Sequence, residues 1–373
     1  MKVNSVLGDL TPREFLRNYW QKKPVLIRQA IPGFQPVLSR DALFALAADE
    51  EVESRLITHF RSQWKLTRGP FASLPPTRRK GWTVLIQGVN LHDDGADDLL
   101  SRFRFIPDAR LDDLMISYAT DTGGVGPHLD SYDVFLLQAE GCRRWRIGRQ
   151  RDHSLVEGVP LKLLRNFAPT TEYLLAPGDM LYLPPHWAHE GVAEGECMTY
   201  SIGFRAPTWQ ELGEAYLGFL AEQVNLRGRY RDSQLSPNAH PAWLGNDMLN
   251  QARQHLGKLG GRPQDLLIFL GENLSEPKPS VWFTPVQRPL SLARFGTALT
   301  TKGLRLSRQS RMLYRDKYIF INGESLQAAG ADSLILQGLA DERSLAPSAA
   351  SGGSADLLET LYDWYQQGWI RFI

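Results

Sequence analysis

The chain has few cysteines and no long apolar run. Only Cys142 and Cys197 occur among 373 residues, which excludes a disulfide scaffold and a zinc site built from thiolates. No segment approaches the roughly eighteen consecutive apolar residues that a membrane-spanning helix requires. The opening residues, MKVNSVLGDLTPREFL, become polar too early to contain the apolar core of a signal peptide. We therefore expect a cytoplasmic protein without a membrane span.

Neither sign of charge is in excess. Forty-two basic and 41 acidic side chains leave a net charge of +1, which excludes a polycation that coats nucleic acid but permits a local basic patch. One segment, 288–317, is locally basic and contains a single acid, Asp316. Its basic residues are Arg288, Arg294, Lys302, Arg305, Arg308, Arg311, Arg315 and Lys317. This segment is either a solvated face or a surface that contacts rRNA or another nucleic acid.

The length and the apolar content, 43%, suit two or three globular domains. A helix is predicted to start at the cap Thr11, a short strand follows Pro24, and a second helical pattern covers 40–58. From residue 82 the sequence changes to short β-like runs separated by Gly and Pro, which are WTVLIQGV, LMISYAT, DVFLLQ, RRWRIG, EYLLA, DMLYLP and MTYSIGF. So many strands without intervening helices predict an antiparallel barrel or sandwich over 1–206.

The strand pattern ends at Pro207, where a helical region begins. Thr208 and Glu211 form a capping-box pattern, and a polar connector at about 226–245 separates this helix from helical runs over 248–259 and 264–271. The first helix carries an apolar stripe of Leu212, Tyr216, Phe219 and Leu220. Such a stripe either covers the barrel or forms a homodimer interface, and we expect the interface.

In the last part of the chain, 275–373, the sequence predicts helical segments, a β-hairpin over SRMLYRDKYIFINGES and a closing helix. Helices and a hairpin in so small a module are typical of a winged-helix arrangement. The sequence thus predicts an α+β, mainly β fold in three parts. These are a barrel domain at 1–206, a helical dimerisation region at 207–274 and a winged-helix-like domain at 275–373.

Two segments hold residues that can bind a metal ion, GGVGPHLD at 123–130 and PGDMLYLPPHWAHEG at 177–191. Because residues i and i+2 of a strand share a face, His128 and Asp130 can converge on one point. A second imidazole, from His189, completes a two-histidine, one-carboxylate triad that leaves three metal positions open, as non-haem Fe(II) oxygenases require.

The second segment adds a more specific spacing than a lone H-x-D motif, which occurs often by chance. Its order of Gly, five residues, Pro, four residues and His is typical of the second metal motif of the cupin superfamily, whose fold is the double-stranded β-helix. His186 competes with His189 for the ligand role. We favour His189, because His186 occupies the place where the cupin motif prefers Gly.

A 2-oxoglutarate-using oxygenase also needs a cation inside the barrel to bind the distal carboxylate of its co-substrate. Arg143 has a planar guanidinium that can bind a carboxylate through two hydrogen bonds. Alternation along a strand allows only one of Arg143 and Arg144 to face inward, and Arg146 is a further candidate. Ser117 and Ser201 lie on neighbouring predicted strands and are candidate hydroxyl donors to the same carboxylate.

The segments GVGPHLDSYDVFLLQAEGCRRWRIG, PGDMLYLPPHWAHEG and YSIGFRAP resemble the JmjC-domain ribosomal oxygenases. The resemblance extends over essentially the whole chain and is strongest to the bacterial branch, which hydroxylates an arginine of ribosomal protein sixteen of the large subunit. It implies Fe(II) bound by His128, Asp130 and His189, 2-oxoglutarate held by Arg143, and a homodimer formed through the helical region. Lys replaces this Arg in the eukaryotic relatives.

The resemblance specifies the oxygenase chemistry more closely than it specifies the substrate. Asp121 and Thr122 depart from the family pattern in a loop that borders the substrate path, and Asp121 and Asp133 are candidate acids for binding a cationic target. One alternative is the same oxygenase chemistry on another protein or on nucleic acid. The other is a cupin-fold binding protein without turnover, against which the complete triad and the inward arginine argue.

Overall fold

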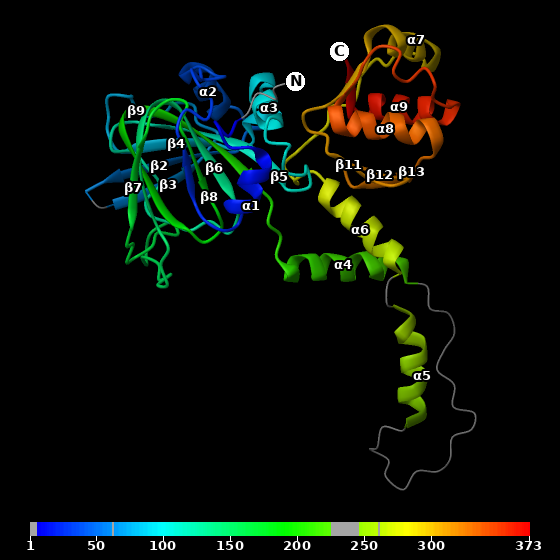
Figure 1. Ribbon diagram of the computed structural model, residues 1–373, viewed down its shortest axis with the longest axis horizontal. Coiled ribbons are helices and arrows are strands. Elements are labelled where there is room, and N and C mark those ends of the chain that lie inside the picture. The colour runs from blue at the N-terminus through cyan, green and yellow to red at the C-terminus, as the bar shows by residue number, and fades with distance from the viewer. Residues whose placement is uncertain (1–5, 62, 225–245, 260–261) are drawn as a thin grey trace. The chain divides into compact units, whose positions relative to one another are not determined.

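The computed structural model describes residues 6–61, 63–224, 246–259 and 262–373 (Figure 1). The chain forms two compact units, Met1–Ala206 and Pro207–Ile373. The predicted connector at about 226–245 lies outside the described residues. Within the described part of the chain, no helix is long and apolar enough to cross a membrane.

The first unit begins with short elements that pack against its sheet. Helix α1 (Pro12–Asn18) is capped by Thr11 and Glu14, which satisfy backbone N–H groups at its start. Strand β1 (Val25–Ile27) pairs with β8 (Met180–Leu183). The predicted helix over 40–58 is wrong beyond its first half, since α2 (Arg40–Ala47) is followed by strand β2 (Ser54–Phe60). Pairing of β2 with two neighbouring strands overrides the local helical pattern.

The strands form one antiparallel nine-stranded sheet in the order β1-β8-β6-β9-β5-β4-β2-β3, with β7 paired to β6. The remaining strands are β3 (Gln63–Arg68), β4 (Trp82–Ile86), β5 (Leu111–Ala119), β6 (Val134–Gly148), β7 (Thr171–Leu175) and β9 (Ala188–Phe204). A 3-10 turn, η1 (Val89–Leu91), and helix α3 (Asp94–Ser101) lie between β4 and β5. The curled sheet and its crossing strands confirm the predicted cupin barrel (Figure 1).

Two long strands, β6 and β9, organise this barrel. They pair with each other along most of their length, and the register shifts near Glu140. Gly141 has a φ of +62° and forms a bulge inside one continuous strand. The bulge bends β6 so that its first half pairs with β8 and its second half with β7.

Two apolar clusters lie on opposite faces of the bent strands. The larger one joins α1, α2 and α3 to the sheet and includes Phe15, Trp82, Phe135 and Tyr200. The smaller one contains Trp145, Ile147, Leu175, Leu181 and Leu183, on the face that also carries the candidate site. The larger cluster therefore supports the barrel from outside and leaves its interior available for chemistry.

The second unit contains the helices α4 (Trp209–Gln223), α5 (Asn246–Leu256) and α6 (Pro263–Ser275), with a 3-10 turn, η2 (Gly257–Leu259). Its C-terminal part holds α7 (Leu292–Lys302), β10 (Leu304–Leu306), β11 (Met312–Arg315), β12 (Tyr318–Ile321), β13 (Glu324–Gln327), α8 (Gly330–Glu342), β14 (Ser344–Leu345), α9 (Ala355–Gln366) and β15 (Ile370–Phe372). The strands form two three-stranded sheets, β14-β10-β15 and β11-β12-β13. Phe295, Leu339, Leu361 and Trp364 lie in their shared core.

Helix α4 has the broad apolar face that the sequence predicts. One part of this face packs against α6, and the other part is exposed. On one flank, the rings of Tyr216 and Phe219 lie 5.1 and 5.7 Å from the ring of Phe269 on α6. On the other flank, Trp209 is 89% and Leu217 68% exposed. The apolar area of α4 that is open to a partner is therefore the Trp209–Leu217 flank.

Candidate metal and co-substrate site

The residues of the two predicted metal motifs converge at one end of the barrel. His128 forms a β-bridge with His189, and Asp130 follows His128 by two residues. One ligand atom from each of His128, Asp130 and His189 lies within 4.8 Å of the others. The Asp130 carboxylate is 3.5 Å from His189 Nε2 and 3.9 Å from His128 Nε2. One cation of ordinary size can contact all three atoms.

Backbone contacts orient both imidazoles. Nδ1 of His128 is 2.9 Å from the carbonyl oxygen of Gly126, and Nδ1 of His189 is 2.9 Å from that of Trp187. Because a carbonyl oxygen accepts only, each Nδ1 carries the proton and each Nε2 has a free lone pair. Burial, reinforced by the neighbouring His128, lowers the pKa of His189 to about 4, so this ligand is neutral at pH 7.

His186 has a different place from His189. Its side chain is exposed and lies outside the group of candidate ligands within the described residues. Its backbone contributes instead, because His186 N–H donates to the carbonyl oxygen of Asp130 at 2.8 Å. The turn before His189 is thereby tied to the loop that carries the other two candidate ligands.

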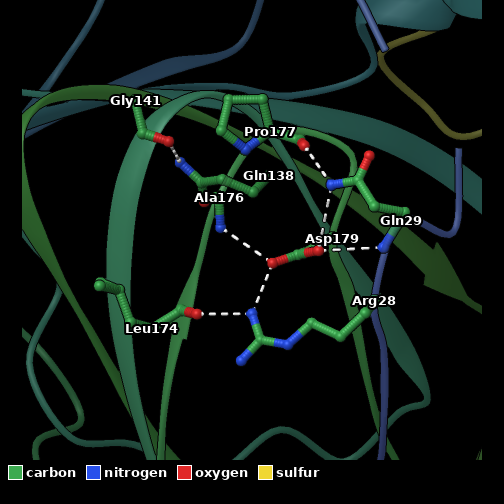
Figure 2. A network of polar contacts seen from close by, with 8 residues as sticks. All are labelled: Arg28, Gln29, Gln138, Gly141, Leu174, Ala176, Pro177 and Asp179. Atoms are coloured by element: carbon green, nitrogen blue, oxygen red, sulfur yellow. Dashed lines mark hydrogen bonds and ion pairs between the residues drawn. The ribbon is translucent and has the colours of Figure 1, made fainter. Parts of the chain in front are cut away.

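The PGD turn before β8 is held by the carboxylate of Asp179, which is 3% exposed (Figure 2). One oxygen accepts from Arg28 Nη1 at 2.6 Å and from the N–H of Ala176 at 3.1 Å, and the other accepts from the N–H of Gln29 at 3.0 Å. Gly178 in this turn has a φ of +88°, which favours glycine. The N-terminal segment thus fixes the start of the strand that leads to His189.

Arg143 lies inside the barrel and has unpaired donors. It is 4% exposed, and its Nη1 donates to Ser117 Oγ at 3.3 Å. Its Nε and Nη2 are buried without any hydrogen-bond partner. Since buried charged donors are normally paired, this arginine fits a carboxylate that arrives with a ligand.

The other predicted co-substrate residues divide into two groups. Arg144 and Arg146 point outward, where Arg144 pairs with Glu172 and Glu194 and Arg146 pairs with Glu190. Ser117 contacts Arg143, whereas Ser201 is half-buried on β9, opposite Met115 and Leu136, and has no hydrogen bond to Arg143. Of the two serines, the structure brings only Ser117 to the arginine.

Asp133, one of the two acids that the sequence suggested for binding a cationic target, does not lie where it could do so. Asp133 is fully buried and accepts from Tyr182 Oη at 2.6 Å, Gln21 Nε2 at 3.0 Å and Arg110 Nη2 at 3.3 Å. Asp133 therefore ties the metal loop to these three side chains and is not available to bind a substrate. Asp121 is partly open but pairs with Lys80 at 2.7 Å.

Sequence reasoning missed Tyr132, two residues after Asp130, and the acids Asp112 and Asp113 of β5, which interact with it electrostatically. Partial burial raises the pKa of Tyr132, and the carboxylates of Asp130, Asp113 and Asp112 raise it further. Tyr132 is 40% exposed. These acids on β5 had no sequence signal beyond a DD pair at the start of a predicted strand, because only the fold brings β5 next to the metal loop.

The donor set and the unpaired arginine fit the groups that the sequence implies. Two imidazole nitrogens and one carboxylate oxygen, with room for further ligands, suit a non-haem Fe(II) centre. The unpaired donors of Arg143 suit the distal carboxylate of a dicarboxylic co-substrate. His128, Asp130 and His189 would hold the metal, and Arg143 with Ser117 would hold the co-substrate.

Comparison with known proteins agrees with this geometry. The JmjC domain family matches residues 98–212, and the ROXA-like winged helix family matches residues 251–371. The ribosomal protein uL16 3-hydroxylase of Escherichia coli is 35% identical over 84% of this chain and 85% of its own. A probable ribosomal oxygenase of Haemophilus influenzae is 32% identical over 96% of each chain.

A solved structure is similar over nearly the full length. YcfD, a ribosomal oxygenase from Escherichia coli in complex with cobalt and 2-oxoglutarate, has a TM-score of 0.86 and 32% identity, and the match covers 98% of this chain and 99% of YcfD. The winged-helix match begins before the predicted boundary at 275, since it includes part of the helical region. The fold, the converging triad and these likenesses place the chain in the JmjC family of ribosomal oxygenases.

Proposed function

We propose that this protein is an Fe(II)- and 2-oxoglutarate-dependent hydroxylase of an arginine in ribosomal protein uL16. The observation that carries the proposal is the His128, Asp130 and His189 triad in the same barrel as the buried Arg143, whose Nε and Nη2 have no partner. The near-full-length likeness to a uL16 3-hydroxylase supports the choice of substrate. When bound, Fe(II) with 2-oxoglutarate and O₂ supplies the oxidation of an unactivated C–H bond.

The chain's own residues bind and orient the reactants. The carbonyl groups of Gly126 and Trp187 keep the Nε2 atoms of the two histidines unprotonated. Arg143 neutralises the distal carboxylate of 2-oxoglutarate, and Ser117 holds the guanidinium in place. The apolar cluster around Trp145 and Leu181 keeps water from this face of the barrel.

The acids near the metal loop suit a cationic target. Asp112 interacts electrostatically with Tyr132, which follows Asp130 by two residues, so an arriving guanidinium can meet these groups at the metal loop. Asp112 also pairs with Arg205 at 3.5 Å, so an incoming guanidinium would compete with an arginine of the enzyme. A planar guanidinium replaces another at a carboxylate better than an ammonium does.

The test is mass spectrometry of ribosomal proteins from cells with and without the gene. We expect uL16 to gain one oxygen atom on an arginine only when the gene is present. In vitro, a uL16 peptide with that arginine should stimulate 2-oxoglutarate decarboxylation, and the same peptide with Lys should stimulate it much less. Equal turnover with Lys, or turnover only with RNA, would transfer the proposal to another protein or nucleic acid substrate.

Three further properties belong to this proposal. We infer a homodimer formed through the helical region, which the exposed Trp209–Leu217 flank of α4 supports. We infer contact with rRNA through the basic segment 288–317, where Arg315 and Lys317 are exposed on the β11–β12 hairpin. We infer a cytoplasmic location, because the inferred substrate is a ribosomal protein.

A further inference from the structure

The indole of Trp145 has a buried N–H group without a hydrogen-bond partner. Trp145 is 4% exposed, and its Nε1 atom has no acceptor in the structure. A buried tryptophan N–H usually finds an acceptor, because leaving the donor unpaired is destabilising. The other buried donors of this kind on the same strand belong to Arg143, which faces the co-substrate. Trp145 therefore points to an acceptor that comes with a ligand.

The register of the barrel places Trp145 midway between the two ends of the candidate site. On paired strands β6 and β9, Ile147 lies opposite His189, Trp145 opposite Gly191 and Arg143 opposite Ala193. Directly opposite residues of an antiparallel pair share a face, so all six side-chain positions face the barrel interior. His189 and Ala193 are four residues apart, which corresponds to about 13 Å along the strand.

Between His189 and Arg143, Trp145 lies over Gly191 on the facing strand. A Cβ atom on Gly191 would lie 2.8 Å from the Trp145 ring, so the indole lies directly over the glycine backbone. The Trp145 ring lies 5.9 Å from the ring of His189, and the guanidinium carbon of Arg143 lies 5.8 Å from the Trp145 ring. A molecule that joins the metal to Arg143 must therefore pass the indole.

We propose that Trp145 positions the co-substrate, its indole N–H donating a hydrogen bond to a carboxylate oxygen of bound 2-oxoglutarate. This inference rests on the proposed function, since it requires that the barrel binds a 2-oxo dicarboxylate. The indole supplies a second, uncharged donor between the metal ligands and Arg143. It restricts how the co-substrate chain can turn while one end is held by the metal and the other by the arginine.

The experiment replaces the N–H without changing the ring. Benzothienylalanine, in which sulfur takes the place of the indole N–H, is introduced at position 145 by amber suppression. Binding of 2-oxoglutarate to the Zn(II)-loaded protein is then measured by calorimetry. We expect the Kd to rise about tenfold, the loss that accompanies one hydrogen bond to a charged acceptor.

Trp82 provides the matched control. It is also buried in this unit, but its Nε1 already donates to the carbonyl oxygen of Pro76 at 3.3 Å. The same replacement at position 82 should leave the Kd of 2-oxoglutarate unchanged. A tenfold rise from both replacements would attribute the effect to general loosening of the barrel and overturn the role of Trp145.

A second measurement uses the unaltered protein. With ¹⁵N-tryptophan labelling, the indole resonance of Trp145, assigned by its loss in Trp145→Phe, should move downfield when 2-oxoglutarate is added to the Zn(II) form. If 2-oxoglutarate binds but neither this resonance nor the Kd of the position-145 variant changes, the inference fails and the proposed function stands. If 2-oxoglutarate does not bind at all, the proposed function fails, and this inference fails with it.

Discussion

At the scale of single residues, the site depends on which lone pairs and donors are left unpaired. The two histidines use Nδ1 on backbone carbonyls and leave Nε2 free, and Arg143 uses Nη1 on Ser117 and leaves Nε and Nη2 free. Each free atom is held in position by the bond that its neighbour makes. The barrel is therefore preorganised for a metal ion at one end and an anion at the other.

The metal ligands give the first prediction. His128→Ala or Asp130→Ala should abolish 2-oxoglutarate turnover and weaken metal binding, because each removes one of three ligands. The fold should persist, since both residues are half-buried and the core lies elsewhere. Succinate formation, metal retention after dialysis and circular dichroism test this. His186→Ala is the control and should keep turnover; full activity in His189→Ala with loss in His186→Ala would reverse our ligand assignment.

Arg143 gives the second prediction. Arg143→Ala leaves the distal carboxylate of 2-oxoglutarate buried without a counter-ion, a loss of about 2–5 kcal/mol. The apparent KM for 2-oxoglutarate should therefore rise by about thirtyfold or more. Steady-state kinetics measure it, with Arg144→Ala as the control, because Arg144 pairs only with glutamates on the outer face. A normal KM in Arg143→Ala would move the co-substrate anchor elsewhere.

At the scale of elements, the barrel is held together by contacts between segments far apart in sequence. Strand β1 and the residues after it attach the N-terminal segment to β8 through Asp179 (Figure 2). Asp133 attaches the metal loop to Gln21, Tyr182 and Arg110. Both carboxylates hold in place strands or loops that lead to or from a candidate metal ligand, so the N-terminal segment supports the site.

Asp179 gives the third prediction. Asp179→Asn should reduce the free energy of unfolding by about 2 kcal/mol, because the neutral amide weakens the bond to Arg28 and opposes an NH₂ group to a backbone N–H. Denaturant unfolding at pH 7 measures it. Asp41→Asn is the control, since Asp41 is 85% exposed in its pair with Arg40 and should change stability little.

The pH dependence of this difference follows from the pKa of Asp179. Despite the opposing effect of burial, the hydrogen bonds from Gln29, Ala176 and Arg28 hold its pKa below the usual value. A lowered pKa means that the stabilisation is complete above the unfolded-state value, about 4, and is lost as the pH falls through the lower folded-state value. The gap between wild type and Asp179→Asn should stay constant from pH 6 to 8 and narrow below about pH 4. A gap that widens in acid would contradict the assignment.

Helix α4 gives the fourth prediction. Charge at Tyr216 or Phe219 would disturb the packing against Phe269, so the dimer test belongs on the other flank. Leu217→Glu should convert the inferred dimer to a monomer, because it places a charge in an apolar interface. Light scattering measures the mass, with Glu222→Lys on the opposite, exposed face of α4 as the control. A dimer that persists in soluble, folded Leu217→Glu would refute the assignment.

At the scale of the whole molecule, the net charge is close to zero, but basic and acidic residues are unevenly distributed. Five of the basic residues in 288–317 are exposed, namely Arg288, Arg294, Lys302, Arg315 and Lys317. Helix α9, by contrast, has Asp356, Glu359 and Asp363 and no basic residue. Contact with nucleic acid, if the winged-helix domain makes it, therefore belongs to the hairpin side and not to α9.

The basic segment gives the fifth prediction. Arg315→Glu with Lys317→Glu should lower affinity for an rRNA fragment severalfold and reduce the steepness of its salt dependence, because two phosphate contacts are lost. Filter binding over a salt series measures both quantities. Arg13→Glu, an exposed change on α1, is the control and should alter neither. Unchanged binding in the double variant would leave this segment as a solvated face.

The sequence by itself determined the chemistry of the site, because ligand types and strand periodicity are local properties. The H-x-D spacing puts two candidate ligands on one face, and the Gly-Pro-His spacing of the second motif brings the third. Alternation also showed that Arg143 and Arg144 face opposite ways. None of these inferences required knowledge of which strands are neighbours.

The tertiary structure decided everything that depends on neighbours distant in sequence. It made 54–58, predicted as helix, part of strand β2 through pairing with β3 and β4, and it buried Asp133 among donors from three other segments. It divided the apolar face of α4 between Phe269 and the surface. It also left the indole N–H of Trp145 without a partner, because whether a donor is paired depends on acceptors that the chain brings together only when folded.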